Sequence, residues 1–204
     1  MAAVRPIRPP SPEPIGLHTQ AMDNLRFIRS TIENSASFTA VPGVGGMLMG
    51  STAVFAAFAA HFSRSPKAWL GIWGFEAMLA LVIGLAFAYR KAMRDGAPLL
   101  SRAFRRFALA LMPAVFVGAL FTFVFYRAGL SNLIPAMWLL LYGVGVSSGG
   151  AFSVRVIPLM GICFLGIGTI TALAPPFWAD YMLAAGFGGL HIVFGYVIAR
   201  KFGG

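Results

Sequence analysis

Two ionisable residues, Glu76 and His191, stand inside long apolar stretches of a 204-residue chain. If both stretches are helical, the two side chains lie on the order of 12 to 15 Å from the same membrane boundary, at similar depth. A charged carboxylate in hydrocarbon costs about 3 kcal/mol or more, so Glu76 is expected to hold a proton or to have a partner. The two residues predict either a proton- or cation-binding site or structural hydrogen bonds that lock neighbouring helices.

A second group that could do chemistry is the segment at residues 145–149, which has the pattern G-x-S-x-G with Ser147 and Ser148 at its centre. These serines fall in the fourth apolar stretch, and His191 falls in the sixth. This arrangement resembles the rhomboid intramembrane proteases, which have a six-helix core, a serine on the fourth helix and a histidine on the sixth. The resemblance implies an intramembrane serine protease. Because Ser147 is near the inner end of its stretch and the first connection, residues 63–67, is short, we assign no catalytic residue.

The charged residues of the chain are mostly basic, with a net charge of +10 and only six acidic residues. They flank apolar stretches, which favours contact with anionic lipid headgroups over nucleic acid. Arg155, in a tight connection beside Ser153, is a candidate for binding a headgroup. The single cysteine, Cys163, and the lack of zinc-ligand spacing predict no metal site and no cofactor. Six basic residues are expected to contact anionic lipids: Arg90, Lys91, Arg94, Arg102, Arg105 and Arg106.

The elements that must position these residues are six apolar stretches of about twenty residues. The chain is 58% hydrophobic and 11% charged, whereas a soluble domain has about a quarter of its residues charged. Each stretch can cross roughly 30 Å of hydrocarbon as a helix, and only a helix satisfies its own backbone there. The prediction is an all-α polytopic membrane protein, a bundle of six transmembrane helices over residues 44–62, 68–89, 108–126, 133–152, 156–174 and 181–199.

The chain before the first span divides into two segments. Residues 1–21 contain five prolines, which predicts a disordered arm. Residues 22–41 carry apolar side chains at helical spacing, with Arg26 and Arg29 off that stripe. This pattern predicts a short amphipathic helix, either in the membrane interface or as a solvated helix packed on the bundle. The six-helix transmembrane domain then extends over residues 44–199. Spans four and five are joined almost directly, so we expect them to be antiparallel neighbours.

The distribution of arginine and lysine predicts the orientation of the chain. If the N-terminus is inside, thirteen basic residues lie on the inner side and three, Arg64, Lys67 and Arg127, on the outer side. This bias places both termini in the cytoplasm. The segment DNLRFIRSTIENSASFTAVPGVGGMLMGSTA, Asp23–Ala53, resembles the start of a family of uncharacterised bacterial multi-pass membrane proteins. That resemblance implies a bacterial inner membrane and no particular activity.

Three functional hypotheses follow. The first is a small membrane protein without catalysis, an accessory or structural subunit that associates with itself or with a larger complex through its glycine-rich spans. The second is a small proton-coupled transporter or channel that uses Glu76 and His191. Three spans followed by three would give it two halves of opposite orientation, as in inverted-repeat carriers. The third is the rhomboid-like protease. A transporter requires Glu76 and His191 to face a common cavity, whereas a structural protein requires them in protein contacts.

Overall fold

The computed structural model describes residues 20–28, 41–94, 96 and 101–202, and the chain forms two compact units, residues 1–36 and 37–204. In the first unit, residues 20–28 form a helix on which the apolar side chains Leu25, Phe27 and Ile28 are exposed. Residues 1–19 of the predicted arm and residues 29–40 of the predicted interfacial helix lie outside the described residues.

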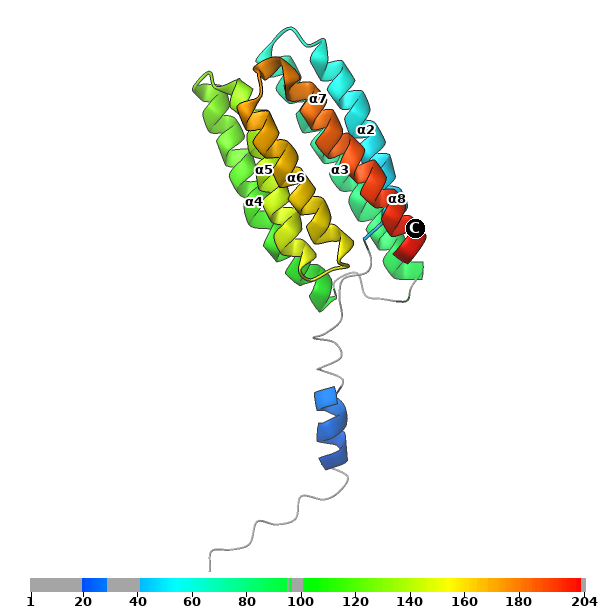
Figure 1. The fold of residues 1–204 in the computed structure, drawn as a ribbon. Coiled ribbons are helices and arrows are strands. Elements are labelled where there is room, and N and C mark those ends of the chain that lie inside the picture. Colours follow the sequence, from blue (N-terminus) through cyan, green and yellow to red (C-terminus); the bar gives the residue numbers. More distant parts are fainter. Residues whose placement is uncertain (1–19, 29–40, 95, 97–100, 203–204) are drawn as a thin grey trace, which may run out of the picture. The chain divides into compact units, whose positions relative to one another are not determined.

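The second unit contains six helical spans that are long and apolar enough to cross a membrane, and the described residues form no strand (Figure 1). The predicted all-α polytopic fold is therefore confirmed. The spans are α2 (Gly43–His61), α3 (Pro66–Arg94), α4 (Arg102–Arg127), η1 (Ser131–Leu133) followed by α5 (Ile134–Gly150), α6 (Val156–Leu173), and a sixth made of η2 (Pro176–Trp178), α7 (Ala179–Leu183), the π-helical η3 (Ala184–Leu190) and α8 (His191–Phe202).

Helices α3 and α4 extend beyond the apolar stretches that predicted them. The prediction ended span two at residue 89 and began span three at residue 108, but the helices continue through the basic residues on both sides. A helix satisfies its own backbone whatever its side chains, so the edge of the apolar stretch does not end it. The side chain of Ser101 accepts a hydrogen bond from the Phe104 amide (3.2 Å) and caps the start of α4.

The six spans pack as two groups of three (Figure 1). In the first group α2 packs on α3 and on the last span, η3 and α8; in the second, α5 packs between α4 and α6. The neighbouring positions of α5 and α6 confirm the prediction from their short connection. The first three spans do not form one group, since the sixth span joins the first two. The two groups meet along a seam where α5 and α6 contact the last span.

Glycines allow the helices of the first group to approach closely. A side chain on Gly195 of α8 would meet backbone atoms of α2, with the Gly43 oxygen and the Met47 nitrogen both 2.7 Å from its β-carbon. A side chain on Gly50 would lie 2.6 Å from the Gly188 oxygen. Close backbone approach of this kind is the main source of helix association in lipid, because leucine and lipid tails are equally apolar.

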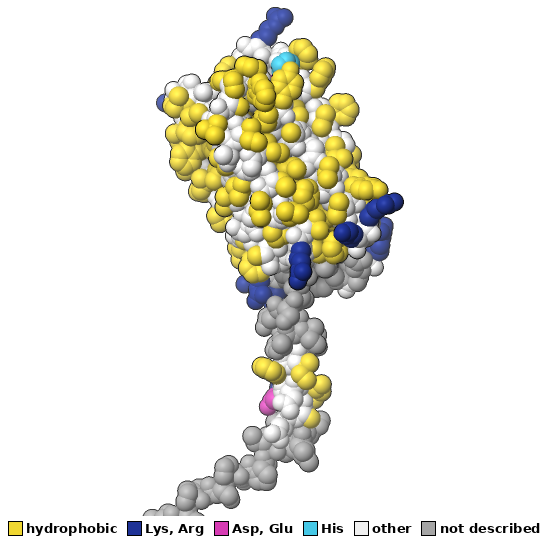
Figure 2. Space-filling model, in the orientation of Figure 1, with side chains coloured by type: hydrophobic (Ala, Val, Ile, Leu, Met, Phe, Trp, Pro, Cys, Tyr) yellow, Lys and Arg dark blue, Asp and Glu magenta, His cyan; other side chains and the backbone are white. Residues whose placement is uncertain are grey.

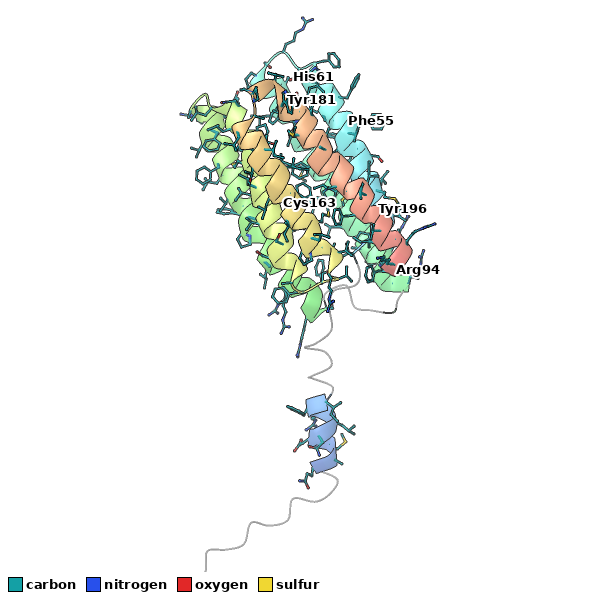
Figure 3. The ribbon with its side chains drawn as sticks, in the orientation of Figure 1. Phe55, His61, Arg94, Cys163, Tyr181 and Tyr196 are labelled. Atoms are coloured by element: carbon teal, nitrogen blue, oxygen red, sulfur yellow. The ribbon has the colours of Figure 1, made fainter. Side chains whose placement is uncertain are left out.

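We call the two ends of the second unit the His61 end and the Arg94 end, after residues labelled in Figure 3. At the Arg94 end the seam is filled by an apolar cluster in which Val146, Val154 and Ile157 of the second group pack with Ile198 of α8. On the face that Figure 2 shows, lysine and arginine side chains of this unit gather over the Arg94 end. At the Arg94 end, the interior of the seam is therefore apolar and the surrounding surface is basic.

Candidate functional site

Glu76, the acidic residue inside the second span, contacts a threonine on the neighbouring helix. It is only 6% exposed, and its Oε1 lies 2.8 Å from Thr52 Oγ1 of α2. The close packing of α2 and α3 brings the two side chains together. The same hydroxyl lies 2.9 Å from the Met49 carbonyl oxygen one turn earlier in α2.

The number of protons shared by Thr52, Met49 and Glu76 limits which of them can donate a hydrogen bond. The Thr52 hydroxyl has one proton, and the Met49 carbonyl can only accept. The hydroxyl can therefore donate to Glu76 Oε1 or to the Met49 carbonyl, and in the second case the carboxyl must supply the proton of its contact with Thr52. The high cost of a bare charge in hydrocarbon favours a neutral carboxyl in both cases.

His191 is held by different partners, at the seam between the two helix groups. Its Nδ1 lies 2.9 Å from the Phe187 carbonyl oxygen, and its Nε2 lies 2.9 Å from the Tyr142 hydroxyl of α5. Because a carbonyl can only accept a hydrogen bond, Nδ1 must carry a proton. In a neutral ring Nε2 is then unprotonated, and it accepts a hydrogen bond from the Tyr142 hydroxyl. His191 is 8% exposed, and this bond joins the last span to the second group.

An aromatic layer surrounds His191 in the middle of the seam. Phe187 stacks on the imidazole with a centroid distance of 6.3 Å, and Phe164, which is fully buried, packs against its edge at 5.6 Å. Trp73 of α3 reaches the same layer, 6.3 Å from Phe187. The π-helical η3 ends where His191 begins α8. Such segments are frequent at functional sites, but here the carbonyl oxygen of Phe187 within η3 accepts a hydrogen bond from His191 Nδ1.

The structure does not bring the predicted site residues together. Glu76 and His191 share no hydrogen bond or ion pair among the described residues, and each is occupied by its own partners. Ser147 is not bonded to His191 either; its buried hydroxyl has no hydrogen-bond partner among the residues that the structure describes, and it faces Gly161 of α6. Ser148 is exposed. The serine–histidine pair that the rhomboid resemblance implied is therefore not formed in the described part of the chain.

Five of the six basic residues expected at lipid headgroups are exposed, and Lys91 is different. Lys91 is 6% exposed, and its ammonium donates to the carbonyl oxygens of Phe202 (2.8 Å) and Val41 (3.2 Å). It holds the end of α8 and the start of α2 instead of facing outward. Arg155 is exposed in the turn before α6. The five exposed residues of the predicted lipid contact are Arg90, Arg94, Arg102, Arg105 and Arg106.

A polar cleft lies at the His61 end, and sequence reasoning missed its acidic residue. The cleft has a volume of about 320 Å³ and is formed by the connections after α2, α4 and α6. Asp180 lines it, with Oδ1 accepting a 2.8 Å hydrogen bond from the Trp69 indole and Oδ2 lying 3.7 Å from His61 Nδ1. Figure 3 shows His61 beside Tyr181, next to this residue. Asp180 was overlooked because it sits just before the apolar stretch that begins at Tyr181.

These features define an all-α multi-pass membrane protein in which the intramembrane polar groups are bound to neighbouring helices. No group of three or more metal-ligating side chains occurs among the described residues. Comparison of the chain with protein-family models, curated proteins and solved structures found no match.

Proposed function

We propose that this protein acts by association in the bilayer, with copies of itself or as an accessory subunit of a larger membrane complex, and has no catalysis of its own. The observation that carries the proposal is the engagement of Glu76 and His191 in contacts between helices of the same chain, which supports a structural role for both residues over transport or catalysis. Neither residue lines the cleft at the His61 end. Their cost in hydrocarbon is offset by hydrogen bonds that specify which helices pack together.

A proton-coupled carrier is the second candidate, because one observation favours it. The seam between the two helix groups has a polar cleft at the His61 end and an apolar cluster at the Arg94 end. A carrier open to one side has this combination. The grouping of the sixth span with the first two gives no support to an inverted repeat of the first and last three spans.

The proposal predicts a large particle and no proton flux. Extracted from native membranes in mild detergent, the protein should migrate as a particle heavier than one 21.8 kDa chain with its detergent. In sealed vesicles with a trapped pH-sensitive dye, the wild type and Glu76→Gln should both dissipate a pH gradient at the rate of protein-free vesicles. A lone monomer would contradict association. Faster dissipation that is lost in Glu76→Gln would establish the carrier instead.

We further propose a bacterial inner membrane with both chain ends in the cytoplasm. The support is the bias of basic residues, since thirteen are assigned to the inner side and three, Arg64, Lys67 and Arg127, to the outer side. Reporter fusions before residue 20 and after Phe202 should both be active only as cytoplasmic reporters. A fusion in the connection after His61 should behave in the opposite way, and chain ends on different faces would overturn the orientation.

A further inference from the structure

The cleft at the His61 end carries two opposite charges that do not contact each other. Asp180 and Arg64 both line it, and among the described residues no ion pair joins them. Arg64 is exposed, in the connection between α2 and α3. Opposite charges that share a cleft without pairing leave room for a ligand that satisfies both.

The Asp180 carboxylate is fixed in place and only half satisfied. Its side chain is 18% exposed, and the Trp69 indole binds only Oδ1. Among the described residues, the basic nitrogen beside Oδ2 is His61 Nδ1 at 3.7 Å, which forms an ion pair when His61 is protonated but is too far for a hydrogen bond. With His61 neutral, Oδ2 is open to an ammonium group, and the aromatic ring of Trp69, which also lines the cleft, favours a cation beside it.

The side of the cleft near Arg64 suits an oxyanion. Ser63 and Ser65 are the sequence neighbours of Arg64, and both line the cleft. Ser65 Oγ accepts a hydrogen bond from the Ala68 amide, so its hydroxyl proton can be donated to a ligand. Ser131 and Asn132 bring a hydroxyl and an amide from the connection after α4. Guanidinium and hydroxyl donors together are the groups that bind phosphate and carboxylate.

We propose that this cleft binds a small zwitterion, with its ammonium on Asp180 and its phosphate or carboxylate on Arg64. Phosphoethanolamine has this chemistry, as a free molecule or as the headgroup of a phospholipid, and the open cleft, with a volume of about 320 Å³, has room for a ligand of that size. This inference is independent of the proposed function, which rests on Glu76 and His191. Particle mass and proton flux test the proposed function, whereas ligand binding tests the zwitterion site. Each proposal can therefore fail while the other stands.

The test uses the full-length protein in nanodiscs of phosphatidylglycerol, a lipid without an ammonium group. Titration calorimetry should show saturable binding of phosphoethanolamine. Arg64→Gln and Asp180→Asn should each weaken it at least tenfold, and ethanolamine or inorganic phosphate alone should bind at least tenfold more weakly. Lys67→Gln, which removes a neighbouring exposed charge that does not line the cleft, is the matched control and should bind within twofold of the wild type.

A second measurement identifies the source of the zwitterion. Protein extracted from mixed phosphatidylethanolamine and phosphatidylglycerol membranes is analysed by native mass spectrometry for retained lipid. Retention of phosphatidylethanolamine that is lost in Arg64→Gln and Asp180→Asn assigns a headgroup site; calorimetric binding without such retention assigns a free zwitterion. Absence of both signals, or equal binding by the wild type and both variants, would overturn the proposal. Because Arg64 is exposed in a connection, Arg64→Gln is expected to fold. This variant therefore tests the proposal even if Asp180→Asn does not fold.

Discussion

Replacing Gly195 by leucine is expected to prevent the bundle from forming its native packing. The three heavy atoms nearest to a β-carbon at this position belong to the backbone of α2, at 2.7, 2.7 and 3.1 Å. A flexible side chain could move aside, but a helix backbone can only move as a whole, away from α8. Overpacking a core typically costs about 1–3 kcal/mol. We expect a loss of at least about 3 kcal/mol for leucine, which must displace a helix, and a smaller loss for alanine.

The measurement is unfolding of the detergent-solubilised protein by titration with sodium dodecyl sulfate, followed by circular dichroism, together with the yield of monodisperse protein. Gly166→Leu is the matched control, because Gly166 of α6 is exposed and no atom lies within 4 Å of its β-carbon position. It should unfold like the wild type. If the variants at Gly195 and Gly166 lose the same stability, close approach of α2 and α8 does not hold the first helix group together.

The sequence was sufficient for the six spans but not for the way they group. Span number and approximate bounds follow from apolar length, because lipid imposes that length on every crossing. Grouping depends on which glycines face each other, and each of the six spans contains at least one glycine. In α5, for example, Gly145 and Gly149 face α4, whereas Gly143 and Gly150 face α6. Hydropathy does not separate two such faces, since both are apolar.

The partners of the polar residues were predictable in kind but not in identity. The cost of burying Glu76 predicts a hydrogen bond to a neighbouring helix, and the structure supplies Thr52. Threonine and tyrosine in an apolar stretch give little signal by themselves, because either can bond within its own helix or lie at an interface. Thr52 and Tyr142 acquire a role only when packing places them opposite Glu76 and His191. Sequence reasoning therefore found one member of each pair.

The partners of Lys91 could not be predicted from the sequence either. Its substitution is expected to have the second large effect on stability. Adjacent basic residues at a span end predict contact with lipid headgroups, but Arg90 and Lys91 point in different directions from one helix. Lys91 Nζ donates hydrogen bonds to the carbonyl oxygen of Phe202, the last residue of α8, and to that of Val41. The last carbonyls of a helix have no partner within it and carry partial negative charge, so a buried ammonium stabilises that end.

Lys91→Met keeps most of the apolar stem of the side chain and removes the ammonium. It should lower the free energy of unfolding by about 1–3 kcal/mol, because the carbonyls of Val41 and Phe202 lose a charged donor at a site that is 6% exposed. The same titration with sodium dodecyl sulfate measures it. Arg90→Met is the control: Arg90 is exposed and lies over the Phe87 ring at 5.8 Å, so its loss should cost no more than about 0.5 kcal/mol. Equal losses in the two variants would mean that the hydrogen bonds from Lys91 to the carbonyls of Val41 and Phe202 add nothing to stability.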